Sequence, residues 1–253
     1  AAGSGKENFL TTMLYSLYRH HSSRELNVYI LDFGAETLQM FADAPQTGDF
    51  VVSGEEEKIQ NLFRYLNQEL KRRKKLFSEA GGDYLSYTRQ GKEKVPNLLV
   101  LINDYTGFSE QYEELNDSMP SLTRDCTKYG IFFVLTCNSS MGIRYKLQQN
   151  FNQAYVLQLN DKTDYISILG NTGGVYPSRI TGRGIFREKE VYEFQTAYVA
   201  ASPENVADEV RCFCKKLRET SKEEKAIAIP VMPKVVSKEC FDCAAISFEH
   251  IPI

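Results

Sequence analysis

Apolar residues along this chain follow two kinds of pattern, one with helical spacing and one made of short uninterrupted runs. Helical spacing is found in residues 6–20, 54–79 and 203–220, and a further helix is expected around 117–129. The apolar stripe of the long second helix contains Ile59, Leu62, Phe63, Leu66, Leu70 and Phe77. Each of these helices is predicted to pack one face against a core.

Runs rich in β-forming residues predict the strands, at residues 27–32, 98–102, 131–136 and 154–159. The last three are typical of strands buried on both faces of a parallel sheet. Residues 184–186 and 191–195 predict an antiparallel hairpin at the sheet edge, whereas the stretch containing Asp43, Pro45 and Gly48 is expected to be irregular. Strands that alternate with helices predict an α/β fold, in which helices cover both faces of a mainly parallel sheet.

The domain organisation follows from where this alternation stops. Residues 1–226 are expected to form a single domain. From Ile229 to Pro233 the sequence becomes extended and irregular, and residues 227–253 are interpreted as a connector towards a following module.

Composition and charge exclude several classes of protein. The chain has 253 residues, of which 42% are hydrophobic and 25% charged, as in soluble globular domains. It contains no apolar run of the roughly 18 residues that suggest a membrane span. The net charge of −3 argues against a surface built to bind nucleic acid. The basic run 71–75 follows the acidic run 55–57 in one helix, so it is interpreted as a solvated face that complements the helix dipole.

Six cysteines are too few for a disulfide scaffold in a chain of this length. Cys212, Cys214, Cys240 and Cys243 offer four thiolates to zinc. The first two lie two residues apart in a helical pattern and point in different directions. Buried cysteines acting as small hydrophobic residues are the preferred interpretation, and no metal site is predicted.

The most informative motif lies at the start of the chain, where Gly3, Ser4, Gly5 and Lys6 precede a helical pattern. In a phosphate-binding loop, glycines allow backbone N–H groups to surround phosphate oxygens, and the lysine reaches the β- and γ-phosphates. The position after the lysine normally holds Ser or Thr, whose hydroxyl binds Mg²⁺. Here it holds Glu7, which places a carboxylate beside any bound triphosphate. Binding of ATP and Mg²⁺ is possible from this motif, but standard Mg·ATP geometry is not expected.

A second site for metal and water is expected at the end of the strand 98–102. ATPases with such loops place an Asp there to hold Mg²⁺, often followed by a Glu that polarises the attacking water. This chain has Asn103 and Asp104 at these positions. Together with Glu7, these residues remove the hydroxyl ligand, the anionic metal partner and the usual base, so ATP hydrolysis is expected to be weak or absent.

Several of these segments, in this order, resemble the FtsK/SpoIIIE class of P-loop ATPases, which has a RecA-like fold. The resemblance covers about residues 1–200. It rests on the loop at Gly3–Lys6, on the segments 31–34, 69–77 and 135–138, on Asn103-Asp104-Tyr105, and on the terminal hairpin at 182–195. It implies that Gly3, Ser4, Gly5, Lys6 and Glu7 form the nucleotide-binding loop. It also implies a sensor-like role for Asn138, and it makes Arg124 a candidate arginine finger, although a solvated helix end is the preferred interpretation of Arg124.

Within the class, the chain resembles ATPase modules of the EssC-type proteins of type VII secretion. That resemblance implies a cytoplasmic domain of a membrane-anchored protein, with tandem ATPase domains in the same polypeptide that export small helical WXG-type proteins. The chain starts inside the loop motif and is interpreted as part of a larger protein, as a middle module. The implied partners are the neighbouring ATPase domains, other secretion components and WXG-type substrates.

Three functions remain open at this point. The preferred one is a degenerate ATPase module with a structural, regulatory or substrate-docking role. The alternatives are a slow ATPase motor domain completed by neighbouring subunits, and an FtsK-like DNA translocase domain. Residues 141–153, which include Met141, Tyr145, Leu147 and Phe151, are apolar enough to line a groove for a helical export signal, although an ordinary core helix is the preferred interpretation.

Overall fold

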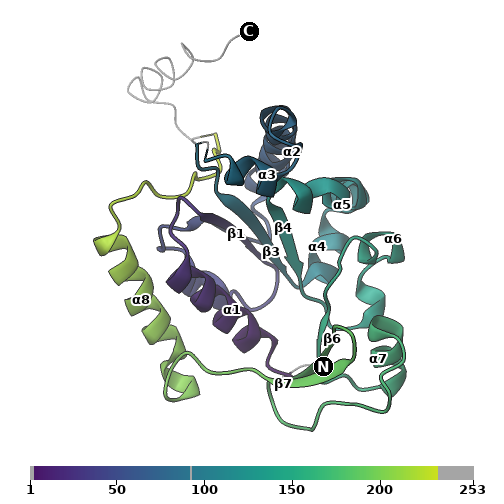
Figure 1. Cartoon of the computed structure of the whole chain (residues 1–253). Coiled ribbons are helices and arrows are strands. Elements are labelled where there is room, and N and C mark those ends of the chain that lie inside the picture. Colours follow the sequence, from purple (N-terminus) through teal and green to yellow (C-terminus); the bar gives the residue numbers. More distant parts are fainter. Residues whose placement is uncertain (1–2, 92, 233–253) are drawn as a thin grey trace.

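The computed structural model describes residues 3–91 and 93–232 and contains two separate β-sheets (Figure 1). The larger sheet is fully parallel, with strand order β2-β1-β3-β4. Its strands are β1 (Leu26–Asp32), β2 (Thr47–Val52), β3 (Asn97–Asn103) and β4 (Ile131–Leu135). The predicted α/β fold with a mainly parallel sheet is therefore confirmed.

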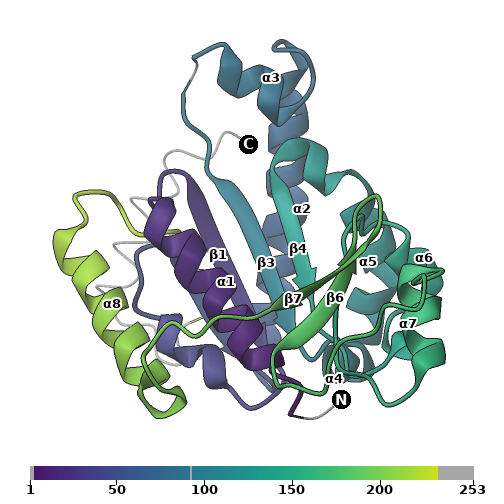
Figure 2. The same ribbon diagram turned by 60° about the horizontal axis from the view of Figure 1, so that its bottom comes forward.

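Helices cover both faces of this sheet, as Figure 2 shows. One face carries α1 (Lys6–His20), the 3₁₀ turn η1 (Thr37–Phe41) and α8 (Val206–Thr220). The other carries α2 (Glu56–Ser78), α4 (Tyr105–Gln111) and α5 (Glu113–Cys126). Shorter helices are α3 (Tyr84–Arg89), α6 (Tyr145–Gln148) and α7 (Lys162–Leu169), and further 3₁₀ turns are η2 (Thr127–Tyr129), η3 (Ser140–Gly142) and η4 (Pro203–Asn205).

The central strands supply both cores because successive side chains of a strand point to opposite faces. In β1, Tyr29 and Leu31 pack towards α2, whereas Val28 and Ile30 pack towards α1. All seven residues of β1 are buried, so this strand and β3 form the centre of the domain.

The second sheet is antiparallel and contains β5 (Tyr155–Leu157), β6 (Arg183–Arg187) and β7 (Val191–Gln195) in that order. The predicted hairpin is thus present as β6–β7. The prediction that residues 154–159 form another parallel strand is wrong, because β5 pairs antiparallel with β6. A small core of its own, made by Val156, Tyr165, Leu169 and Ile185, holds α7 against this sheet.

Two further sequence predictions are corrected. Residues 47–52, within the stretch expected to be irregular, form the parallel edge strand β2. Its first half has the sequence Thr-Gly-Asp, which lacks the alternation of apolar and polar residues that indicates a strand. Residues 141–153 do not form a long helix: only residues 145–148 are α-helical, and Met141 and Tyr145 are exposed while Leu147 is buried. These residues therefore do not line a common groove.

A buried arginine connects the starts of β3 and β4, at one end of the parallel sheet. Arg73 of α2 is fully buried and donates hydrogen bonds to Glu69 Oε1 (2.7 Å) and to the carbonyl oxygens of Pro96 (2.7 Å), Tyr129 (2.9 Å) and Gly130 (3.1 Å). Pro96 and Gly130 immediately precede β3 and β4. The guanidinium thus satisfies the last carbonyls before two strands, and its charge is balanced by Glu69.

Candidate functional site: the phosphate-loop cavity

The loop before α1 has the backbone shape that an anion-binding loop requires. Gly3 and Gly5 have φ angles of 73° and 95°, in the left-handed region that favours glycine. The loop lies against the segment before β6, where Gly182 N donates to Ser4 O at 2.9 Å. A Cβ atom on Gly5 would come within 2.8 Å of Gly182 N, so this close approach also requires glycine. The Ser4 hydroxyl is buried and has no hydrogen-bond partner.

Lys6, the first residue of α1, points across the loop to the end of β4. Its Nζ donates to Asn138 Oδ1 at 2.5 Å. The structure therefore brings together the loop lysine and the sensor-like asparagine, which are 132 residues apart in sequence. Next to Asn138 lies Cys137, where burial raises the pKa of the thiol and the Lys6 ammonium opposes that shift. The net rise keeps this thiol protonated and weakly nucleophilic at neutral pH.

The carboxyl ends of β1 and β3 carry a buried polar network. Asp32 and Asn103 are register partners on these neighbouring strands, and Asn103 Nδ2 donates to Asp32 Oδ1 at 2.9 Å. The other amide atom, Asn103 Oδ1, accepts a hydrogen bond from Thr136 Oγ1 at 2.7 Å. Asp32 also accepts from the backbone N–H groups of Gly34 (3.0 Å) and Leu38 (3.3 Å). Both ends of the Asn103 amide are thus committed to protein partners.

Asp104 follows this network in a strained conformation. Its φ of 59° places a residue other than glycine in the left-handed region, a feature that gathers at functional sites. Its backbone N–H donates to Thr136 Oγ1 at 3.0 Å, which fixes the residue to the same network. Its Oδ1 atom is buried and has no hydrogen-bond partner. Asp104 therefore presents a carboxylate whose hydrogen-bonding capacity is not used by the protein.

These groups enclose a cavity of about 190 Å³, lined by Gly3, Ser4, Lys6, Glu7, Gly34, Asn103, Asp104 and Asn138. All the candidate residues except Gly5 line it directly, and Gly5 belongs to the same loop. One wall offers loop N–H groups and a lysine, which suit a phosphate. The rest of the lining offers the amides of Asn103 and Asn138 and the carboxylates of Glu7 and Asp104. No group of three or more His, Cys, Asp or Glu side chains within residues 3–91 and 93–232 could hold a metal ion.

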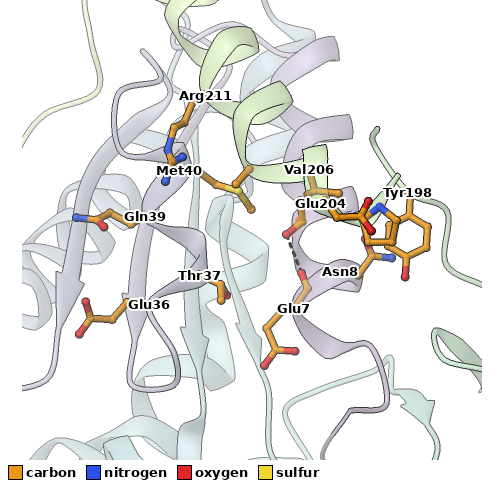
Figure 3. A pocket seen from close by; sticks show the side chains of 13 residues that line it. Glu7, Asn8, Glu36, Thr37, Gln39, Met40, Tyr198, Glu204, Val206 and Arg211 are labelled. Atoms are coloured by element: carbon orange, nitrogen blue, oxygen red, sulfur yellow. Dashed lines mark hydrogen bonds between the residues drawn. The ribbon is translucent and has the colours of Figure 1, made fainter. Parts of the chain in front are cut away.

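Glu7 does not contribute a metal ligand of the usual kind. Its side chain is exposed and lies between this cavity and a second one of about 360 Å³. Figure 3 shows the second cavity, which is bounded by α1, η1 and the start of α8. Glu36 and Glu204 also line it, with Arg211 as the basic side chain. The environment around Glu7 is thus acidic, and it disfavours the phosphates of a nucleotide on that side of the loop.

Sequence reasoning missed Asp32 and Thr136 as parts of the site. Asp32 ends a strand next to the one that ends at Asn103, and two polar residues at the ends of neighbouring parallel strands are the signal that could have revealed the pair. Arg124 is exposed in the last turn of α5 and lines neither cavity. For the zinc alternative, Cys212 is exposed and Cys214 is buried, and Cys240 and Cys243 lie outside the described residues.

Comparison with known proteins decides the family. The model of the FtsK/SpoIIIE family matches residues 1–181, which is well over half of the chain. The chain belongs to the FtsK/SpoIIIE family. The loop at Gly3–Lys6 and the strand end at Asn103 and Asp104 both lie within the matched residues.

Curated relatives come from type VII secretion. The chain is 29% identical over 243 residues to the ESX secretion system protein YukB of Bacillus subtilis, a match that covers 94% of this chain and 16% of that protein. It is 25% identical to the type VII secretion system protein EssC of Staphylococcus aureus, and this match covers 94% of this chain and 16% of that protein. The chain thus spans about a sixth of the length of these relatives.

Solved structures agree with the family. EssC (ATPases 2 and 3) from Geobacillus thermodenitrificans superimposes with a TM-score of 0.86 at 25% identity, over 96% of this chain and 47% of that one. EccC (ATPases 2 and 3) of Thermomonospora curvata, solved in complex with a signal sequence peptide, shares the fold, with a TM-score of 0.79 at 22% identity. This match covers 93% of this chain and 44% of that one. None of the helices within residues 3–91 and 93–232 has the length and apolar character needed to cross a membrane.

Proposed function

We propose that this chain is a degenerate ATPase module of a type VII secretion motor, with a structural, regulatory or substrate-docking role. Homology to type VII secretion proteins supports the setting, and the network at the ends of β1 and β3 supports the degeneracy. The module would work beside other ATPase domains of the same polypeptide, in a cytoplasmic part of a membrane-anchored protein that exports WXG-type substrates.

The observation that carries the proposal is the state of Asn103. Its amide nitrogen is bonded to Asp32 and its amide oxygen to Thr136, so the residue that would hold Mg²⁺ is neutral and already engaged. At the other metal position, Glu7 offers a carboxylate in place of a hydroxyl. The residues present therefore do not fit Mg²⁺ in the usual geometry, whereas the loop N–H groups and Lys6 fit a phosphate.

ATP turnover by the purified chain tests this proposal. With Mg·ATP in excess, phosphate release at the level of a Lys6→Ala variant is the expected result, because Lys6 is the residue that any hydrolysis on this loop requires. Turnover clearly above that of Lys6→Ala would overturn the proposal.

A second candidate is a slow ATPase that neighbouring subunits complete. The buried Ser4 hydroxyl and the Asp104 carboxylate favour it, because both have unused hydrogen-bonding capacity beside the loop. It requires turnover that appears only when neighbouring ATPase domains are added and that disappears in Lys6→Ala. Absence of turnover in that mixture would eliminate this candidate.

A further inference from the structure

Residues 226–232 cross the outer edge of β2 and reach α2 as an extended segment, which we call the strap. The Ala226 N–H donates to Pro45 O (2.8 Å), just before β2, and the Ile229 N–H donates to Asp49 Oδ2 (2.8 Å), within β2. The Met232 N–H then donates to Glu57 Oε1 (2.7 Å), in the first turn of α2. The strap therefore runs in the same direction as β2 and ends where α2 begins.

The domain also binds the carbonyl groups of the strap. Tyr29 Oη donates to Ile227 O at 2.9 Å, and Asn61 Nδ2 donates to Pro230 O at 2.7 Å. A Cβ atom on Gly48 would lie 2.7 Å from Ile227 O and 2.5 Å from the Tyr29 ring, so this passage requires a glycine. Donors and acceptors from β1, β2, α2 and Pro45 thus bind the backbone of five of the seven strap residues.

One side chain anchors the strap. Ile229 is 4% exposed and joins the core between the sheet and α2, whereas Ile227 and Met232 are 63% and 74% exposed. Apart from Ala226, the strap buries no other apolar residue among those described. Its attachment rests on one apolar contact and on single hydrogen bonds, without a strand ladder or a helix.

Release of the strap would not leave a buried charge without a partner. Asp49, which accepts from Ile229, is also bound by Lys58 at 3.2 Å, and Lys58 is in turn held by Glu55 at 3.1 Å. The ion pairs remain when the strap leaves, and the exposed Glu57 returns to water. A segment with one anchor, and with acceptors that stay satisfied without it, is suited to open while the domain stays folded.

We propose that residues 226–232 form a releasable strap, anchored by Ile229, that couples its own closed position to the first turns of α2. When closed, it holds Met232 at Glu57. When open, it releases this contact and loosens the start of α2. This inference is independent of whether the phosphate loop binds or hydrolyses ATP.

Amide hydrogen exchange on the full chain tests the strap. The Ile229 and Met232 amides should be protected, but they should open more often than the amides of β1 and β3. Asn61→Ala should accelerate exchange across the strap by several-fold to about tenfold, because the hydrogen bond to Pro230 O is lost together with the one that Asn61 Oδ1 accepts from Arg64 Nη1. The matched control is Asn67→Ala, since Asn67 lies in the same helix but bonds only Phe63 O of that helix.

Three outcomes would overturn the proposal. The first is an unprotected strap in the unaltered chain. The second is a strap that exchanges only at the rate of global unfolding, which would make it a fixed part of the core. The third is an equal effect of Asn61→Ala and Asn67→Ala. Coupling to α2 requires that Ile229→Ala, a change in the strap and outside the helix, also accelerates exchange in the first turns of α2, and unchanged exchange there would refute the coupling.

Discussion

The two ends of the parallel sheet are built differently. Where β3 and β4 begin, the buried Arg73 has four hydrogen-bond acceptors and a charge partner. Where the strands end, beside the phosphate loop, Ser4 Oγ and Asp104 Oδ1 are buried without partners, as are Asn8 Oδ1 and Thr196 Oγ1 nearby. These are four of the six such side-chain atoms in the described part of the chain, and the other two, Gln46 Oε1 and Asn97 Oδ1, lie where β2 and β3 begin.

This contrast separates stability from function within one sheet. A buried polar group without a partner costs stability, and such groups collect where a ligand or a neighbouring subunit can satisfy them. The end with Arg73 is therefore built for folding, and the end with the loop is built for an interaction. The Asp32–Asn103 pair is the exception at the second end, because each of its four side-chain polar atoms has a partner within the protein.

Replacing Arg73 should give the largest effect. Arg73→Met removes the donor to the carbonyl groups of Pro96 and Tyr129 and one of the two donors to Gly130 O, and it is expected to lower the free energy of unfolding by about 3–5 kcal/mol. Urea denaturation measures this. Arg72→Met is the matched control, because Arg72 also binds Glu69 but is 54% exposed, and it should cost no more than about 1 kcal/mol. Equal losses in the two variants would contradict the assignment of this end to stability.

The Asp32–Asn103 pair should show strong coupling. Asp32→Asn places two amide groups against each other and is expected to cost about 1–3 kcal/mol of unfolding free energy, because a buried donor loses its acceptor. Adding Asn103→Asp restores one carboxylate and one amide, so the double variant should recover part of this loss, while one of the backbone N–H groups of Gly34 and Leu38 still lacks an acceptor. A double-mutant cycle by denaturation checks the prediction. Additive effects would mean that the two side chains do not depend on each other.

Sequence reasoning predicted most of the fold and most of the residues that line the cavity. Strands β1, β3 and β4 were predictable because their apolar runs are long enough to exclude alternatives, although β4 is an edge strand in which only Ile131 is buried, and not the strand buried on both faces that was expected. The edge strand β2 was not, because Thr47, Gly48 and Asp49 lack a strand pattern and their structure depends on pairing with β1. The loop was readable from spacing alone. The role of Asp32 could not be predicted from the sequence, because it depends on which strands are neighbours in the sheet.

Restoring the metal position should change nucleotide binding more modestly. Glu7→Thr combined with Asn103→Asp supplies a hydroxyl and a carboxylate, and the Kd for Mg·ATP is expected to fall by about tenfold or more, which corresponds to roughly one charge-assisted contact. Calorimetric titration measures it. Glu204→Gln removes a carboxylate from the second cavity only and serves as the control. An unchanged Kd in the double variant would show that positions 7 and 103 do not limit the affinity for Mg·ATP.

The smallest effect concerns pH at the Arg73 end. Burial would raise the pKa of Glu69, but hydrogen bonds from Arg72 and Arg73 outweigh it and hold that pKa below its usual value. A lowered folded-state pKa means that the contribution of Glu69 is complete above its unfolded pKa, about 4.3, and is lost as the pH falls through the folded value. Glu69→Gln should therefore flatten the loss of stability below about pH 4.5. An unchanged acid slope in this variant would exclude Glu69 as its source.

The central claim is that the phosphate loop keeps its shape while its metal partners are gone. The most direct measurement is calorimetric titration of the unaltered chain with ATP, once with Mg²⁺ and once with EDTA. Mg²⁺ is expected not to improve the affinity, so that any binding is equal in the two titrations. Binding that is clearly tighter with Mg²⁺ and that is lost in Lys6→Ala would contradict it.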